Sequence, residues 1–160
     1  MTSGPYAHGE LDREIVLSRV IDAPRELVFR AWTDPKRMFQ WFGPRGFRCE
    51  VREQGEAKVG AVWRFDMIAP NGHRFDNRIT FLEIVPNERL VWDHGSDKDD
   101  DPDRFRATVT FDAKPDGKTL LTLRQIHPTK ARRAEVIGFG AVELGYETLD
   151  KLAEWLAHHA

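Results

Sequence analysis

A long stretch in the middle of the chain alternates apolar and polar residues and is interrupted by turn-forming residues. Between residues 46 and 127, this alternation is clearest in the segments 61–68, 75–81 and 105–111. The interruptions are Pro70-Asn71-Gly72, Pro86-Asn87-Glu88 and Pro115-Asp116-Gly117. A period of two is typical of half-buried strands, and short turns between consecutive strands favour antiparallel pairing. The sequence therefore predicts roughly six antiparallel strands in this stretch.

Segments with other periods flank this predicted sheet. Residues 12–21 alternate and predict one further strand. The next segment, up to residue 32, has apolar residues at helical spacing, and Pro24 suits its first turn. Asp34-Pro35 predicts a second short helix with Asp34 as its cap, which Gly43-Pro44 ends.

The last 30 residues predict one long helix. Its apolar face has a spacing of three or four residues: Val142, Gly145, Leu149, Leu152 and Leu156. Only this helix is long enough to cover a face of the predicted sheet. We therefore expect an α+β fold in which a curved antiparallel sheet wraps around the C-terminal helix. A gap remains between sheet and helix, and the two short helices plug one end of it.

Composition limits the classes of function. The chain has 160 residues, 41% of them hydrophobic, which suits one domain at 11–160 after a flexible polar tail at 1–10. Lys and Arg number 24 against 26 Asp and Glu, and this balance argues against nucleic-acid binding. The N-terminus lacks a signal-peptide pattern, and no window is apolar enough for membrane insertion, so we expect a soluble cytoplasmic protein.

Cysteine and histidine spacing exclude the common metal sites. Cys49 is the single cysteine, so an internal disulfide and a cysteine cage are excluded, and we expect a quiet buried thiol. The histidines lack the spacing of metal ligands; they are His8, His73, His94, His127, His158 and His159. No phosphate-binding or dinucleotide-binding glycine motif occurs in a suitable context. We expect no metal and no cofactor.

Several motifs resemble one known superfamily. These are residues 21–29 (IDAPRELVF), 32–35 (WTDP), 41–44 (WFGP), 81–92 (FLEIVPNERLVW) and Gly145-Tyr146 before the last leucines. Over residues 12–157 the chain resembles the START-related helix-grip superfamily, also called Bet v 1-like or SRPBCC. Within it, the chain is similar to the C-terminal domain of the activator of the heat-shock-protein 90 ATPase. The resemblance implies a helix-grip fold. The superfamily includes lipid carriers, hormone receptors and polyketide cyclases.

The predicted inward faces supply the candidate ligand-binding residues. Aromatic and apolar side chains dominate them, with a few polar groups that must be hydrogen-bonded when buried. The candidates are Trp41, Trp63, Phe65, Met67, Phe75, Asn77, Ile79, Phe81, Trp92, Phe105, Val109, His127 and Tyr146. The same side chains could instead fill a solid core, and a slip of one residue in strand register would turn them outward.

Three functions remain open from the sequence. The first is binding of a small hydrophobic molecule, which is lipid-like, aromatic or polyketide-like, between sheet and helix. The second is an enzyme of cyclase, dehydratase or hydrolase type in the same cavity, with His127 or a carboxyl group of raised pKa as base. The third is a chaperone-associated interaction domain, for which Trp32, Trp41 and Phe42 would form the surface. A protein partner or a homodimer is compatible with each.

An acidic segment at 97–103 interrupts the predicted strands. It contains five Asp and one Lys. Like charges repel one another, so we expect a solvated loop. The alternative is a cation site, although the segment lacks the spacing of a known calcium loop.

Overall fold

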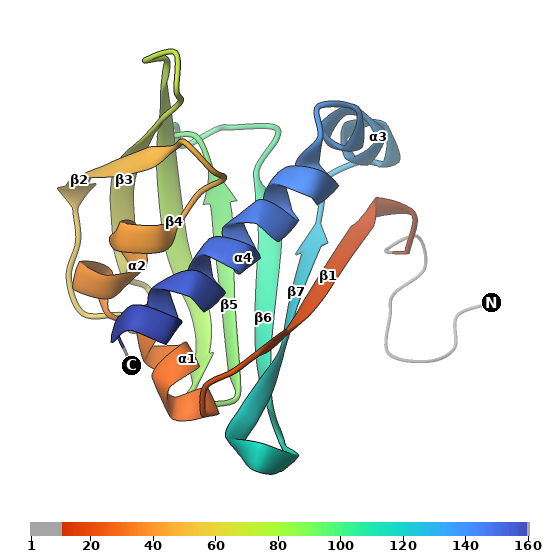
Figure 1. Cartoon of the computed structure of the whole chain (residues 1–160). Helices are drawn as coiled ribbons and strands as arrows, with labels where there is room; N and C mark the ends of the chain where they lie inside the picture. The colour runs from red at the N-terminus through yellow and green to blue at the C-terminus, as the bar shows by residue number, and fades with distance from the viewer. Residues whose placement is uncertain (1–10, 160) are drawn as a thin grey trace.

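Seven antiparallel strands form one curved sheet in the computed structural model, which describes residues 11–159 (Figure 1). In space the strands follow the order β1-β7-β6-β5-β4-β3-β2. Their bounds are β1 Glu14–Ile21, β2 Arg48–Glu53, β3 Val62–Ile68, β4 Arg74–Val85, β5 Arg89–Gly95, β6 Phe105–Lys114 and β7 Lys118–Ile126. The expected tail at 1–10 lies outside the described residues.

The turns between consecutive strands lie where the sequence predicts them. Gly72 has φ 87° in the β3–β4 hairpin, and Asn87 has φ 64° between β4 and β5. Asp116, with φ 70°, lies in the short 3-10 helix Pro115–Gly117 that joins β6 to β7. Glycine, asparagine and aspartate are the residues that best tolerate this left-handed conformation. These short turns keep each strand beside its sequence neighbour.

Two short helices, α1 (Arg25–Thr33) and α2 (Pro35–Trp41), follow β1. Pro24 occupies the N-cap position of α1, one residue before the first turn in which we expected it. Asp34 caps α2 as predicted, because its side chain accepts a hydrogen bond of 3.0 Å from the backbone N–H of Lys36. Gly43, with φ 103°, takes the chain away from α2.

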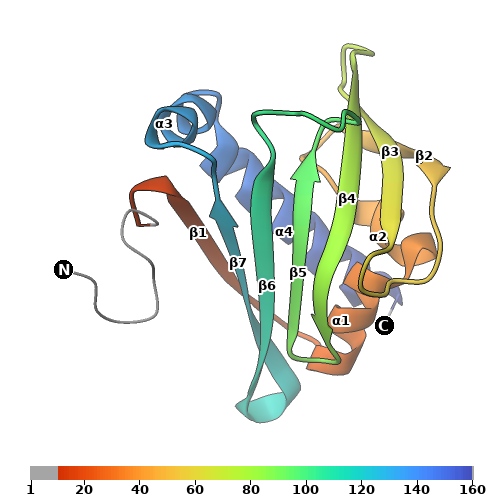
Figure 2. The same ribbon diagram turned by 180° about the vertical axis from the view of Figure 1, so that it is seen from behind.

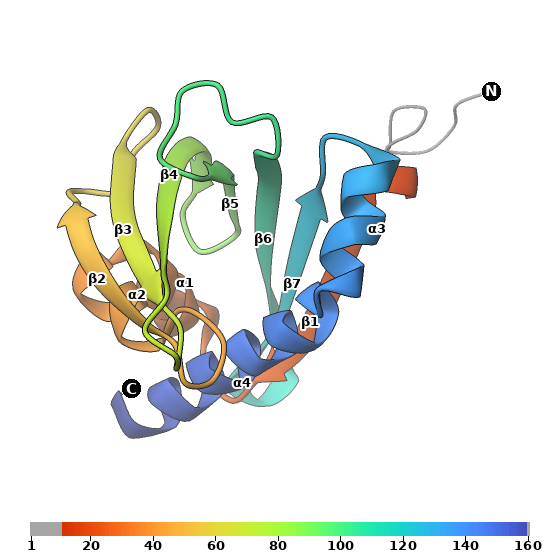
Figure 3. The same cartoon turned by 90° about the horizontal axis from the view of Figure 1, so that it is seen from above.

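The C-terminal region forms two helices, which corrects the prediction of one long helix. They are α3 (Lys130–Gly138) and α4 (Ala141–His159). Gly140 between them has φ 92°, the left-handed conformation that ends many helices. The apolar spacing continues across this position, so it conceals the break. In Figure 3, α3 turns away from α4 and lies beside the end of β7.

Helix α4 crosses one face of the sheet diagonally, as Figures 1 and 2 show from opposite sides. Leu149, Leu152 and Leu156 are its buried residues. Gly145 allows a close approach to β1, because a Cβ atom there would lie 2.3 Å from Cδ1 of Leu17. Arg19 of β1 also pairs with Asp150 of α4 at 2.7 Å. The sheet therefore grips α4 as a helix-grip fold requires, and the α+β class is confirmed.

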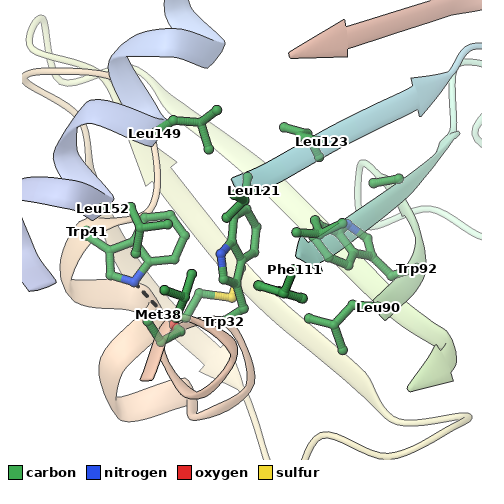
Figure 4. Close-up of a cluster of buried hydrophobic side chains, with 14 of the residues drawn as sticks. Trp32, Met38, Trp41, Leu90, Trp92, Phe111, Leu121, Leu123, Leu149 and Leu152 are labelled. Carbon is green, nitrogen blue, oxygen red and sulfur yellow. Dashed lines mark hydrogen bonds between the residues drawn. The ribbon is translucent and has the colours of Figure 1, made fainter. Parts of the chain in front are cut away.

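A large part of the interior beneath α1, α2 and α4 is solid. Trp32 and Trp41 pack edge to face, with ring centroids 4.8 Å apart, and are surrounded by buried leucines (Figure 4). The indole N–H of Trp41 donates a hydrogen bond of 3.2 Å to the carbonyl of Ala31. Phe111 and Leu121 close this core from the sheet side. Trp32 also lines a small hollow beside this core.

Candidate ligand-binding site

Two adjoining hollows lie at the end of the sheet that carries α3 and the loop between β5 and β6. Figure 3 looks onto this end. The inner hollow has a volume of about 100 Å³ and lies between the sheet, α1 and α4. The outer hollow has a volume of about 380 Å³ and reaches the acidic loop and α3. His94 and Phe105 line both hollows and so lie where the two adjoin.

The inner hollow is mostly apolar. Its lining contains no charged side chain among the described residues. It consists of Trp32, Phe42, Trp92, His94, Phe105, Ala107, Leu123, Gln125, Gly145 and Thr148. Its volume is below that of an engineered apolar cavity of about 150 Å³ that binds benzene. The inner hollow therefore has room for an end group rather than for a long chain.

The outer hollow has a polar lining. It consists of Phe75, Asp76, Asn77, His94, Gly95, Ser96, Lys98, Asp101, Asp103, Phe105, His127, Arg132 and Val136. Its volume lies within the usual range for small-molecule sites, roughly 300–1,000 Å³. The sequence predicted one elongated, mostly apolar cavity. The structure instead divides the space into an apolar inner part and a polar outer part.

Three rings form a continuous row along this end of the sheet. His94 on β5 stacks against Phe105 on β6, with centroids 5.0 Å apart and ring planes 23° apart. His127, which follows β7, lies 5.0 Å from the other side of Phe105 at 34°. The three rings therefore form a stack that borders the outer hollow.

The hydrogen bonds of the two histidines determine which ring nitrogen carries the proton. Nε2 of His94 lies 2.8 Å from Oδ1 of Asn77, and Nε2 of His127 lies 3.1 Å from Oε1 of Gln125. Amide oxygens only accept hydrogen bonds, so Nε2 is the donor in each ring. In the neutral ring, Nδ1 is then an acceptor. Nδ1 of His127 is buried and has no partner among the described residues.

Both histidines are held in the neutral form. Burial lowers the pKa of His94 to about 4. Burial also lowers the pKa of His127 to about 4, with a further contribution from the positive charges of Arg132 and Arg133. The two side chains therefore offer neutral hydrogen-bonding groups at neutral pH.

The acidic loop is mostly exposed to solvent, as the sequence predicted, and arginines hold its first aspartate. Asp97 accepts hydrogen bonds from Nε of Arg64 at 3.0 Å and from Nε of Arg78 at 2.8 Å. Burial alone would raise the pKa of Asp97, but these hydrogen bonds outweigh it and lower the pKa. Arg132 on α3 lies 3.7 Å from Asp103 and so spans the outer hollow. The loop is a fixed part of the wall.

Within the part of the chain that the structure describes, no group of three or more His, Cys, Asp or Glu is arranged to hold a metal ion. Cys49 is half-buried, and burial raises the pKa of its thiol to about 12. Its thiol donates a weak hydrogen bond to the carbonyl of Phe42 at 3.5 Å. No described helix has both the length and the apolar character to cross a bilayer.

The predicted site residues fall into distinct locations. Trp92 and Phe105 line the inner hollow, while Phe75, Asn77, Phe105 and His127 line the outer one. Trp41 lies in the core and also borders a separate surface hollow beside Trp155. The packed interior contains Trp63, Phe65, Ile79, Phe81 and Val109, with Met67 partly buried against it. Tyr146 is 38% exposed and lines neither hollow.

Several lining residues were not among the predicted site residues. His94 follows Leu90 and Trp92 at the same two-residue spacing, so the strand pattern contained the signal for it. Gly145 and Thr148 lie on the apolar side of α4. Arg132 and Val136 come from α3, whose separate direction depends on the unpredicted break at Gly140.

The fold agrees with comparisons to known proteins. The family model described as "Activator of Hsp90 ATPase homolog 1-like protein" matches residues 22–157. The chain belongs to this family. The family has a helix-grip fold of the ligand-binding type. A comparison with functionally curated proteins finds no significant match.

Solved structures of several bacterial proteins share this fold. A protein of Chromobacterium violaceum is 29% identical, with a TM-score of 0.72 over 89% of this chain and 95% of that one. A protein of Nitrosomonas europaea is 25% identical, with a TM-score of 0.80 over 92% and 96%. A protein of Arthrobacter aurescens, 20% identical, has a TM-score of 0.84 over 92% and 88% and shows the similarity of fold alone.

Proposed function

We propose that the protein binds a small, compact, largely aromatic molecule in the two adjoining hollows. The observation that carries this proposal is the shape of the site. An apolar recess of about 100 Å³ opens beside a polar one of about 380 Å³, and the row of rings formed by His94, Phe105 and His127 lines the outer hollow. A ligand would insert an end group into the recess and place its ring beside this row.

The proportions of the site favour an aromatic ligand over a long lipid. A long acyl chain needs a continuous apolar channel, whereas most of the volume here has polar walls. Apolar contact in the inner hollow would contribute roughly 25 cal/mol for each Å² buried, before the cost of association. The polar groups of the outer hollow would orient the remainder of the ligand.

An enzyme in the same hollows has less support. The carboxyl groups with shifted pKa values are Glu50, Asp66, Asp97, Asp101 and Glu154, and each shifts downward. A general acid at neutral pH needs an upward shift. His127, with its pKa near 4, is a weak base. A chaperone-associated role, a homodimer and the cytoplasmic location stay predictions from the sequence.

The test is to fill the inner hollow. Ala107 on β6 is buried and lines that hollow, whereas Ala113 on the same strand is exposed. We expect native mass spectrometry and a thermal-shift screen of aromatic compounds to detect ligands of the unaltered protein. Ala107→Leu should abolish the thermal shifts, and Ala113→Leu should preserve them. A screen that produces no shift with the unaltered protein would contradict the proposal.

A further inference from the structure

Two of the five tryptophans carry indole N–H groups that have no hydrogen-bond partner among residues 11–159. They are Trp32 of α1 and Trp92 of β5, which are 2% and 3% exposed. Both residues line the inner hollow, with ring centroids 5.6 Å apart and planes 38° apart. Two tryptophans with unpartnered donors therefore line one small space.

The other three tryptophans show the contrast. Trp41 donates to the carbonyl of Ala31 at 3.2 Å, and Trp63 donates to the carbonyl of Gly55 at 3.1 Å. Trp155 donates to the side chain of Gln40 at 3.0 Å. Buried tryptophan N–H groups usually have such partners, because an unsatisfied donor loses its hydration without compensation. Only the two indoles beside the inner hollow depart from this rule among the described residues.

The missing partner must be an oxygen or nitrogen acceptor. An indole N–H donates and cannot accept, so a hydroxyl hydrogen or an amine hydrogen cannot satisfy it. The lining of the inner hollow holds no charged side chain among the described residues, and a buried carboxylate without a partner cation is costly. The lining therefore favours an uncharged acceptor such as a carbonyl oxygen.

We propose that Trp32 and Trp92 recognise a carbonyl oxygen at the inner end of the ligand, and that the ligand class is aromatic ketones and related aryl carbonyl compounds. The inference rests on the proposed function and adds to it the chemical group that the inner hollow selects. The acetyl-sized end of such a molecule enters the inner hollow. Its ring remains against His94 and Phe105.

A matched pair of probes tests this recognition. Acetophenone and α-methylstyrene have the same shape, but the first carries C=O where the second carries C=CH₂. Indole N–H resonances are recorded by ¹⁵N–¹H correlation spectroscopy of the unaltered protein during titration with each probe. We expect acetophenone to move the Trp32 and Trp92 indole N–H signals downfield, because its carbonyl oxygen accepts hydrogen bonds from them. α-Methylstyrene has no such acceptor and should not cause this downfield shift. We expect acetophenone to bind roughly five- to 150-fold more tightly, because a buried donor left unsatisfied costs about 1–3 kcal/mol.

Three variants assign the signals and provide the control. Trp32→Phe and Trp92→Phe each remove one donor and one resonance, and each should reduce the preference for acetophenone. Trp155→Phe removes a donor outside the hollows and should leave the preference unchanged. Should Trp32→Phe fail to fold, triple-resonance assignment of the unaltered protein identifies its indole signal.

The outcomes separate the two proposals. Equal affinity for both probes, with signals of the hollow residues perturbed alike, would overturn carbonyl recognition while supporting ligand binding. Downfield shifts confined to Trp41, Trp63 or Trp155 would also overturn carbonyl recognition. If neither probe perturbs any resonance of the hollow, the proposed function itself fails.

Discussion

His94 and Phe105 lie on neighbouring strands with their rings stacked 5.0 Å apart, and both line the inner hollow as well as the outer one. They are direct partners in the register of β5 and β6. Phe105 also contacts His127, so its ring is the central member of the row. Phe105 therefore lies at the centre of the site, where the two hollows adjoin.

Replacing Phe105 should widen the site where the two hollows adjoin. We expect Phe105→Ala to reduce the free energy of unfolding by about 2–3 kcal/mol, below the usual range for a fully buried phenylalanine because Phe105 is partly exposed. The widened site should bind a naphthyl ketone better than a phenyl ketone. Urea denaturation and calorimetric titration measure these effects. Phe139→Ala, at a side chain that is 70% exposed, should change neither quantity. An unchanged order of ligand preference in Phe105→Ala would contradict the assigned role of Phe105.

The sequence predicted the sheet well, because its determinants are local. Strand alternation and turn chemistry depend on residues close in the chain. Each of the three predicted turns contains a residue with positive φ. The cap at Asp34 is equally local. The break at Gly140 was missed because apolar spacing continues on both sides of it.

The site was harder to predict, because it depends on where strands end and how large side chains pack. Phe75 has the inward parity of β4, yet it is 48% exposed. The pairing of β4 with β5 begins only at Arg78, so Phe75 lies beyond the part of β4 that pairs with β5. Tyr146 lies one residue after Gly145 on α4, which turns it about 100° away from β1. Neither effect can be deduced from alternation alone.

The two buried histidines should make the protein sensitive to mild acid. Both have a folded-state pKa of about 4, below the ordinary value of 6.5, so the folded protein favours the neutral form. Their contribution to stability is complete above pH about 6.5 and is lost as the pH falls toward 4. Between pH 7.5 and pH 5 we expect a loss of roughly 2 kcal/mol for each histidine.

Denaturation with urea at the two pH values tests this prediction. His94→Gln and His127→Gln should each reduce the pH dependence, and His158→Gln, at an exposed position, should not. The window stays above the range in which Glu50, with its pKa of about 2, loses its stabilising contribution. Equal stability of the unaltered protein at pH 7.5 and pH 5 would show that the histidines are not held neutral by burial.

The hold of the arginines on the acidic loop should depend on Asp97. Asp97→Asn removes the charge that Arg64 and Arg78 share, and we expect faster amide exchange across residues 96–104 with a stability loss of about 1 kcal/mol. Asp100 is exposed and has no ion pair or side-chain hydrogen bond in the described structure, so Asp100→Asn is the matched control. Hydrogen exchange followed by mass spectrometry measures both variants. Identical exchange in the two would mean that the loop is ordered by its backbone alone.

The close contact between α4 and β1 should be specific to glycine. A Cβ atom on Gly145 would lie 2.3 Å from Cδ1 of Leu17, and Leu17 is only 2% exposed, so its side chain has little room to move. We expect Gly145→Ala to destabilise the protein by about 1–2 kcal/mol, because the steric cost exceeds the gain of about 1 kcal/mol in helix propensity. Gly138→Ala, in α3 with open space at its Cβ position, should be neutral or stabilising.

A double-mutant cycle distinguishes steric contact from a general effect on the helix. Leu17→Ala removes the atom that the new methyl group would meet, so adding Gly145→Ala to it should cost little or even stabilise the protein. Urea denaturation of the unaltered protein, the two single variants and the double variant gives the coupling energy between the two positions. We expect the double variant to be more stable than the sum of the two single effects predicts. If the cost of Gly145→Ala is the same with Leu17 and with Ala at position 17, the close approach of α4 to β1 does not determine the choice of glycine. Gly145 lines the inner hollow, so the position of α4 beside that hollow would then need another explanation.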